Sequence, residues 1–233
     1  MILLALMLLS LGVADLARPQ DQPADRLAVL RAVGAGAAVQ ALGAWGAGLD
    51  WRWVLLGIAV LVGWVLTTPV GALAAKVHPW PIVTLGALAL GMLAASAHLP
   101  RPEGWLTEWY ASLALGSLNG VAFERFALAA GCIVFLVDSA NIIVRMVLAG
   151  TDPGVMASEQ TLKGGRVLGP IERVFIFAMA LSGQYAALTA VVAAKGILRF
   201  PEISRDVAGR KAEYVLVGSF VSWSLALIFV PLL

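Results

Sequence analysis

The fold class follows from an uncharged stretch, residues 53–75, which reads WVLLGIAVLVGWVLTTPVGALAA. A helix that crosses a bilayer needs about 20 mostly apolar residues, and this stretch meets that requirement. The whole chain has the same character, since 61% of its 233 residues are hydrophobic, 13% are charged and the mean hydropathy is +0.90. Soluble domains carry about 25% charged residues. The sequence therefore predicts an integral membrane protein rather than a soluble enzyme or a disulfide scaffold.

Apolar stretches on both sides of residues 53–75 predict an all-α, polytopic bundle of about seven spans, because backbone polar groups in lipid must be satisfied inside the protein. The predicted spans are Met1–Ala17, Leu27–Leu49, Trp53–Ala75, Pro81–Leu99, Phe126–Ala149, Ile171–Phe200 and Ala212–Val230. Their number falls to six if Leu27–Leu49 lies flat. An interfacial helix is expected near residues 105–120. Tryptophans that flank these segments are expected at membrane interfaces, namely Trp51, Trp53, Trp80, Trp105 and Trp109.

Residues 1–233 are expected to form a single integral membrane domain. Residues 25–99 and 124–230 have similar layouts of three spans each, which predicts an inverted repeat of the kind found in secondary transporters. Chance similarity between Ala-rich helices is the alternative. The sixteen basic residues divide eight against eight between the two sides, so the positive-inside rule leaves the orientation open.

The composition also argues against several classes of partner and cofactor. The net charge of +2 is spread along the chain without a basic block, so no nucleic-acid partner is expected. Cys132 is the single cysteine, and the two histidines, His78 and His98, lie at opposite ends of one predicted span. No phosphate-binding loop, zinc motif or nucleophile elbow is present in the sequence, so we expect no metal and no cofactor.

Ionisable residues inside a span are expensive in lipid and are functional candidates by default. The fifth predicted span holds Asp138, Asn141 and Arg145 on one helical face. Asp138 and Arg145 are about 10 Å apart along the helix, too far for a direct pair, so each needs a partner elsewhere. A polar clamp between helices is the structural alternative to a functional site.

The sixth predicted span carries four polar residues at intervals of eleven, eleven and four: Arg173, Gln184, Lys195 and Arg199. On a straight helix these side chains would share one stripe, with Gln184 near the middle of the membrane. Alternatively, Gly183 marks a break that leaves two half-helices in a re-entrant hairpin. We expect the fifth and sixth spans to pack together.

That packing predicts two contacts between the fifth and sixth spans. Asp138 or Asn141 would meet Gln184, and Arg145 would lie near Glu172. An unpaired charge in hydrocarbon costs about 2.5–3.5 kcal/mol on insertion scales, which favours such pairing.

The order of residue pairs in the C-terminal third is distinctive: Glu172-Arg173, Gly183-Gln184, Ala194-Lys195, Arg199-Phe200 and Glu213-Tyr214. In this order and spacing, residues from about 162 to 230 resemble a family of small bacterial multi-pass membrane proteins known as a domain of unknown function. The first predicted helix departs from that family, because it carries Asp15 without the family's His and Asp-Phe pattern. The resemblance implies a bacterial inner-membrane location and no particular reaction.

Three functions remain open on the sequence alone. The first is a small transporter or permeation protein for an ionic or polar solute. The second is an accessory subunit that packs against a membrane partner or a second copy. The third is an enzyme acting on a phospholipid-type substrate, which lacks an identifiable nucleophile and base. The candidate substrate-binding residues are Asp138, Asn141, Arg145, Glu172, Arg173, Gln184, Lys195 and Arg199, and lipids are expected partners.

Overall fold

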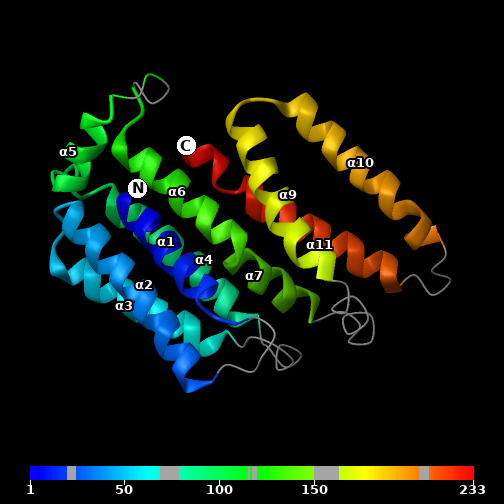
Figure 1. Ribbon diagram of the computed structural model, residues 1–233, viewed down its shortest axis with the longest axis horizontal. Helices are drawn as coiled ribbons and strands as arrows, with labels where there is room; N and C mark the ends of the chain where they lie inside the picture. The colour runs from blue at the N-terminus through cyan, green and yellow to red at the C-terminus, as the bar shows by residue number, and fades with distance from the viewer. Residues whose placement is uncertain (20–24, 69–78, 115, 117–119, 150–162, 205–209) are drawn as a thin grey trace. The chain divides into compact units, whose positions relative to one another are not determined.

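The computed structural model describes residues 1–19, 25–68, 79–114, 116, 120–149, 163–204 and 210–233 (Figure 1). For residues 163–167, 199, 201–203, 210 and 211 it describes the backbone only. Within these ranges the protein is all-α, as the hydropathy predicts, with ten α-helices and no strand. The helices are α1 (Ile2–Leu16), α2 (Arg26–Gly46), α3 (Trp51–Thr67), α4 (Trp80–Ser96), α5 (Trp105–Ser112), α6 (Phe123–Val137), α7 (Ser139–Leu148), α9 (Lys163–Leu181), α10 (Tyr185–Ser204) and α11 (Arg210–Leu227).

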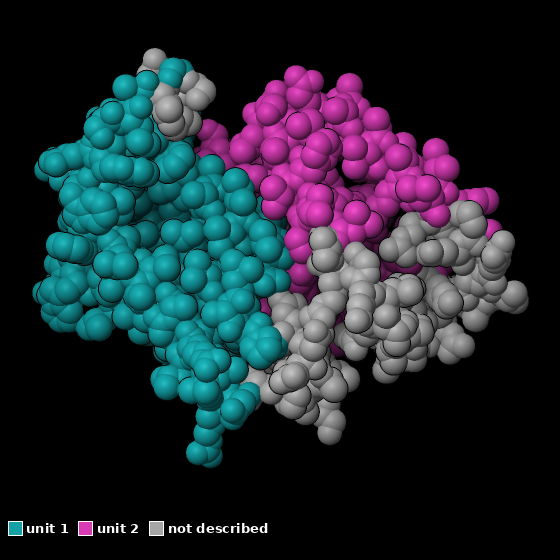
Figure 2. Space-filling model, in the orientation of Figure 1, with its two compact units in different colours: residues 1–73, 78–139 teal, residues 74–77, 140–233 magenta. Residues whose placement is uncertain are grey.

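The chain divides into two compact units (Figure 2). Unit 1 comprises residues 1–73 and 78–139, and therefore contains α1 to α6 and the first residue of α7. Unit 2 comprises residues 74–77 and 140–233, with the rest of α7 and helices α9, α10 and α11. The division in α7 follows a break in the helix at Asp138, whose φ is −119° and ψ −45°.

Helix α1 forms the centre of unit 1, where it packs against α2, α3, α4 and α6. Apart from Ser10 and Asp15, its side chains are apolar on all faces, and a helix of that kind is buried all round. Two glycines let α1 and α6 approach closely. A Cβ on Gly12 would lie 2.8 Å from the backbone nitrogen of Phe135, and one on Gly131 would lie 2.6 Å from the carbonyl oxygen of Ala5.

The expected number of about seven spans is wrong for the described residues. Two segments are long and apolar enough to cross a membrane, Arg26–Gly46 and Ala212–Leu232. Phe123–Val137 and Ser139–Leu148 would add a third as a pair, although they are bent by 48°. Over three of the other predicted spans the helix is shorter than the apolar stretch, with 15 residues in α1 and 17 each in α3 and α4. Hydropathy alone does not register where a helix ends.

The segment 105–120, expected to be one interfacial helix, forms the eight-residue helix α5 at its start. Trp51, Trp80, Trp105 and Trp109 are exposed, and Trp53 is half-buried. Their placement at a membrane interface remains a prediction.

The sixth predicted span, Ile171–Phe200, is not one helix. α9 ends at Leu181, and α10 begins at Tyr185. Gly183 has a φ of +68°, a conformation that glycine adopts without a Cβ clash. The backbone N–H groups of Gly183 and Gln184 bond to the carbonyls of Ala180 and Met179 at 3.1 and 2.9 Å, which is the Schellman pattern of helix termination. The break that the sequence offered as an alternative at Gly183 is therefore present.

Within unit 2, α9 and α10 form a helical hairpin, and both pack against α11 (Figure 1). The straight stripe expected from Arg173 to Arg199 is consequently folded in two, with part of it on each arm. Residues on opposite sides of the turn face each other instead of lying at opposite ends of one helix.

Candidate functional site

Two neighbouring residues of α9, Glu172 and Arg173, bond to two neighbouring residues of α11, Ser222 and Trp223. The hairpin adds Lys195 from α10, and α7 adds Asn141. We call these six residues the charged cluster: Asn141, Glu172, Arg173, Lys195, Ser222 and Trp223. All six lie in unit 2.

Glu172 holds α9, α10 and α11 together. Lys195 Nζ lies 2.6 Å from Glu172 Oε2, and Trp223 Nε1 donates to Glu172 Oε1 at 3.0 Å. The ammonium group of Lys195 also lies 5.5 Å from the centre of the Trp223 ring, within the range of a cation–π interaction. The side chains of Lys195 and Glu172 are 24% and 10% exposed, so the pair is largely but not fully screened from its surroundings.

Arg173 is the most deeply buried charge of the cluster, with 2% of its surface exposed. Its Nη2 donates to Asn141 Oδ1 at 2.6 Å, and its Nη1 donates to Ser222 Oγ at 3.4 Å. Arg173 therefore joins α9 to both α7 and α11.

The formal charges of the cluster sum to +1, from Arg173, Lys195 and Glu172. Guanidinium and ammonium groups bind carboxylates and phosphates through charge-assisted hydrogen bonds. Glu172 already supplies one carboxylate to Lys195, so the site has the chemistry to hold an anion and contains an internal anion that competes for it.

The structure thus brings together four of the eight predicted residues: Asn141, Glu172, Arg173 and Lys195. Arg145 lies half-buried in the last turn of α7, and Gln184 is exposed in the turn between α9 and α10. Asp138 is half-buried at the break between α6 and α7. The side chain of Arg199 lies outside the described part of the structure.

The two predicted contacts stay predictions. Arg145 and Glu172 both belong to unit 2, and the two carboxylate oxygens of Glu172 accept from Lys195 and Trp223. Asp138 belongs to unit 1 and Gln184 to unit 2, so their contact remains a prediction. Asn141 was the other expected partner of Gln184, and its amide oxygen accepts from Arg173.

A second polar group, which sequence reasoning missed, lies inside unit 1. We call it the Asp15 cluster, and it consists of Asp15, Arg18, Trp64, Thr68 and Ser139. Asp15 is paired with Arg18, and its Oδ2 accepts from Trp64 Nε1 at 2.9 Å and from Ser139 Oγ at 2.5 Å. Asp15 is 0% and Arg18 4% exposed.

Arg18 also closes the C-terminal end of α3. Its Nη1 donates to the carbonyl oxygens of Val65 at 3.3 Å and Thr68 at 2.9 Å. The residue that would continue the helical bonding to Val65 is Pro69, which has no N–H to donate. A basic side chain that bonds the last carbonyls of a helix stabilises its C-terminus. The Asp15 cluster is therefore a clamp that ties α1, α3 and the first residue of α7.

Signals for the Asp15 cluster were present in the sequence. Asp15 interrupts an apolar segment. Pro69 has no N–H, which indicates that the carbonyl of Val65 needs another donor. Ser222 and Trp223 carried no such signal, because a serine and a tryptophan in an apolar helix are unremarkable until α9 is placed beside them. Among the described residues, no group of three His, Cys, Asp or Glu side chains is placed to hold a metal ion.

Comparison of the chain with protein-family models, with curated proteins and with solved structures gives no match.

Proposed function

We propose that this chain is a multi-pass integral membrane protein that carries a small anionic solute across the membrane, with the charged cluster as its binding site. A bacterial inner-membrane location goes with the proposal, on the resemblance of residues 162–230 to a family of small bacterial membrane proteins. The single observation that carries the proposal is the placement of Arg173, Glu172 and Lys195 on the inner faces of helices whose outer faces are apolar.

The apolar outer face is clearest on α9. Over residues 168–181, where the side chains of α9 are described, the exposed residues recur every three or four positions and are all apolar, namely Leu168, Ile171, Phe175, Ala178 and Leu181. Arg173 lies on the opposite, buried face. A helix in water shows the reverse arrangement, with charges outside and apolar residues inside. In membranes, charged residues face the bundle interior or a hydrated cavity, which is the pattern of α9.

The same inversion occurs on the neighbouring helices. On α10, Lys195 lies on the half-buried face with Leu188, Val191 and Val192, while Ala190 and Ile197 are exposed. On α11, Ser222 is buried while Leu216 and Phe220 are exposed. Three consecutive helices with polar interiors and apolar exteriors favour lipid, rather than water, as their solvent.

The charges of the cluster favour an anion as the solute. An incoming carboxylate or phosphate would replace Glu172 at Lys195 and find Arg173 one residue away on α9. Glu172 would keep its bond from Trp223 Nε1 during the exchange. A site that alternates between an internal and an external anion can both bind and release, which transport requires.

The experiment is an uptake assay with purified protein in liposomes, using radiolabelled acetate, succinate and inorganic phosphate as probes. Uptake above that of protein-free liposomes is expected for at least one of them. Arg173→Gln and Lys195→Gln should each lower it by about tenfold or more, because a hydrogen bond to a charged group contributes about 1.5–3 kcal/mol. Arg125→Gln removes the same charge from an exposed site in α6 and should leave uptake unchanged.

Folding is controlled by gel-filtration profile and thermal midpoint of each variant. If folded wild-type protein takes up none of the three probes, or if the cluster variants transport as well as Arg125→Gln, the proposal fails.

A second function, a subunit that packs against a membrane partner, is favoured by one observation. Both carboxylate oxygens of Glu172 already have donors within the chain, as a purely structural clamp would require. Glu172→Gln separates the two functions. A clamp predicts a lower thermal midpoint in detergent with no activity to lose, whereas a transport site predicts altered uptake at any stability.

A further inference from the structure

The turn at Gly183 changes how the C-terminal third crosses the membrane. We infer that α9 and α10 cross it as a hairpin whose outward apolar faces contact lipid acyl chains. The Glu172–Lys195 pair then lies near the middle of the bilayer, and the turn at residues 182–184 emerges at the far surface. This inference rests only on the part of the proposed function that places the chain in a membrane.

The lengths of the two arms fit a crossing. α9 has 19 residues and α10 has 20. At 1.5 Å per residue these helices are about 28 and 30 Å long, close to the roughly 30 Å of a bilayer's hydrocarbon core. Neither is among the segments long and apolar enough to cross alone. Three of the charges that lower their hydropathy, Glu172, Arg173 and Lys195, bond to other residues inside unit 2.

The depth of the charged pair follows from three helices independently. Glu172 is the tenth of the 19 residues of α9, and Lys195 is the eleventh of the 20 residues of α10. Trp223, which donates to Glu172, is the twelfth of the 21 residues in the apolar segment Ala212–Leu232. If that segment crosses the membrane, its centre is at mid-depth, and the residues bonded to it are at mid-depth as well.

This coincidence separates a full crossing from a re-entrant hairpin. A re-entrant hairpin would place its turn at mid-depth and the Glu172–Lys195 pair near the membrane surface. Trp223 would then be at the surface, although it lies near the middle of an apolar segment that is long enough to span. A full crossing satisfies all three helices together.

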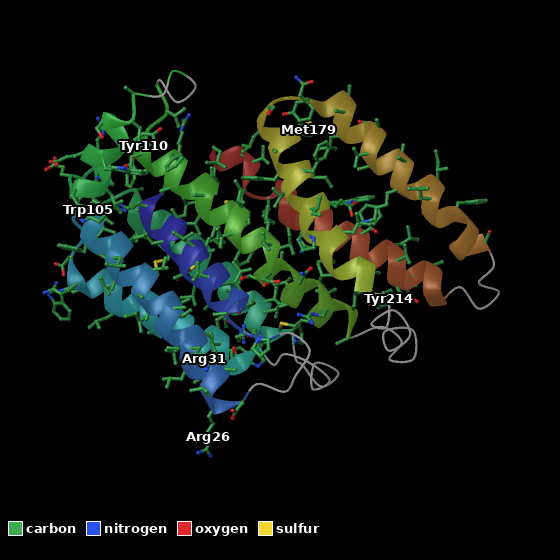
Figure 3. The ribbon with its side chains drawn as sticks, in the orientation of Figure 1. Arg26, Arg31, Trp105, Tyr110, Met179 and Tyr214 are labelled. Carbon is green, nitrogen blue, oxygen red and sulfur yellow. The ribbon has the colours of Figure 1, made fainter. Side chains whose placement is uncertain are left out.

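The turn carries residues that are typical of a membrane surface. Ser182, Gly183 and Gln184 are exposed, and Tyr185 beside them is 64% exposed. Tyrosine is enriched at the headgroup level. In Figure 3, Met179 marks the end of unit 2 that carries the turn, and Tyr214 marks the opposite end, near the start of α11. α10 ends at Ser204 and α11 starts at Arg210, so these two ends share one side of the membrane.

The test uses single cysteines in a Cys132→Ala background, since Cys132 is the chain's one cysteine. Gln184→Cys and Ser204→Cys are exposed to a membrane-impermeant maleimide in right-side-out and in inverted vesicles. The expected result is labelling from opposite sides of the membrane. Glu213→Cys, at the exposed start of α11, should label from the same side as Ser204→Cys.

Each other outcome overturns the inference. Gln184→Cys protected from both sides means a re-entrant hairpin, and Gln184→Cys labelled from the same side as Ser204→Cys means a hairpin lying on one surface. The labelling needs no transported solute, so its failure leaves the uptake result untouched, and failed uptake leaves the labelling result untouched.

Contact with lipid is tested separately by nitroxide labels at two exposed alanines, Ala178→Cys on α9 and Ala190→Cys on α10. Mobile spectra with high accessibility to oxygen are expected if acyl chains cover these faces. Immobile spectra would mean a protein partner, and spin–spin broadening would mean a second copy of this chain; either result overturns the assignment to lipid.

Discussion

Asp15 and Arg18 stand three residues apart at the end of α1, and neither side chain reaches the surface of unit 1. Burying one charge alone would be very costly, whereas a pair with further hydrogen bonds is tolerated. Trp64 and Ser139 also donate to Asp15, and the carbonyl oxygens of Val65 and Thr68 accept from Arg18. The pair thus depends on contributions from helices that are distant in sequence.

Replacing Asp15 by asparagine should destabilise the protein strongly. Asp15→Asn keeps the shape of the side chain but leaves Arg18 buried without a counter-charge. Breaking a buried pair in this way costs about 3–5 kcal/mol. The free energy of unfolding in detergent, measured by denaturant titration, is expected to fall by that amount.

The chain offers a matched control for this change. Asp50 is exposed, and its Oδ1 accepts from the backbone of Arg52 at the start of α3. Asparagine serves equally well at such a position, so Asp50→Asn should be close to neutral. Equal stability of the two variants would show that the charge of Asp15 is not needed by the fold.

The packing of α1 against α6 depends on glycines, which have no side chain, at the points of closest approach. α1 and α6 approach so closely at Gly12 and Gly131 that a Cβ at either position would overlap backbone atoms of the other helix. Small residues at helix contacts are typical of membrane proteins, where close van der Waals packing drives association.

Gly12→Ala and Gly131→Ala should therefore each lower the free energy of unfolding by about 1–3 kcal/mol, as overpacking does in a close-packed interior. Gly34→Ala is the control, because nothing lies within 4 Å of a Cβ at that position on α2. This control should be neutral or stabilising by up to about 1 kcal/mol, since alanine favours helix over glycine. Thermal midpoints in one detergent compare the three variants, and indistinguishable midpoints would contradict the close contact.

Sequence reasoning reached the helices and four residues of the charged cluster, but it missed how they meet. Hydropathy identifies apolar segments because contact with lipid and burial inside a helix bundle both favour apolar side chains. It does not detect a stop such as Gly183, whose effect lies in one backbone angle. Once α9 and α10 are separate, Lys195 meets Glu172, a pairing that no single-helix projection contains.

At the scale of the whole molecule, the apolar surface is the dominant feature. Monomeric soluble proteins rarely expose contiguous apolar patches larger than about 300–600 Å². Here large apolar side chains are exposed on nearly every long helix, including Leu30 on α2, Leu66 on α3, Leu90 on α4 and Leu198 on α10. The sequence predicted this from composition, but its estimate of seven spans exceeded what the described helices support.

Membrane integration should be measurable directly. After expression, the protein is expected to stay in the membrane pellet during extraction with alkaline carbonate and to enter the soluble fraction only with detergent. The reason is that its exposed apolar faces have no other favourable solvent. Recovery in the carbonate supernatant would rule out a protein held by its own membrane-spanning helices.

The contact between Glu172 and Lys195 across the α9–α10 hairpin restricts which insertions and deletions the gene can accept. Glu172 lies nine residues before the end of α9, and Lys195 lies ten residues after the start of α10. One residue added to either arm between the pair and the turn would rotate its partner by about 100° and shift it by about 1.5 Å. Glu172 would then lose its contact with Lys195. Residues on the outer faces can be exchanged for other apolar residues. The number of residues between Glu172 and Lys195 has to stay the same.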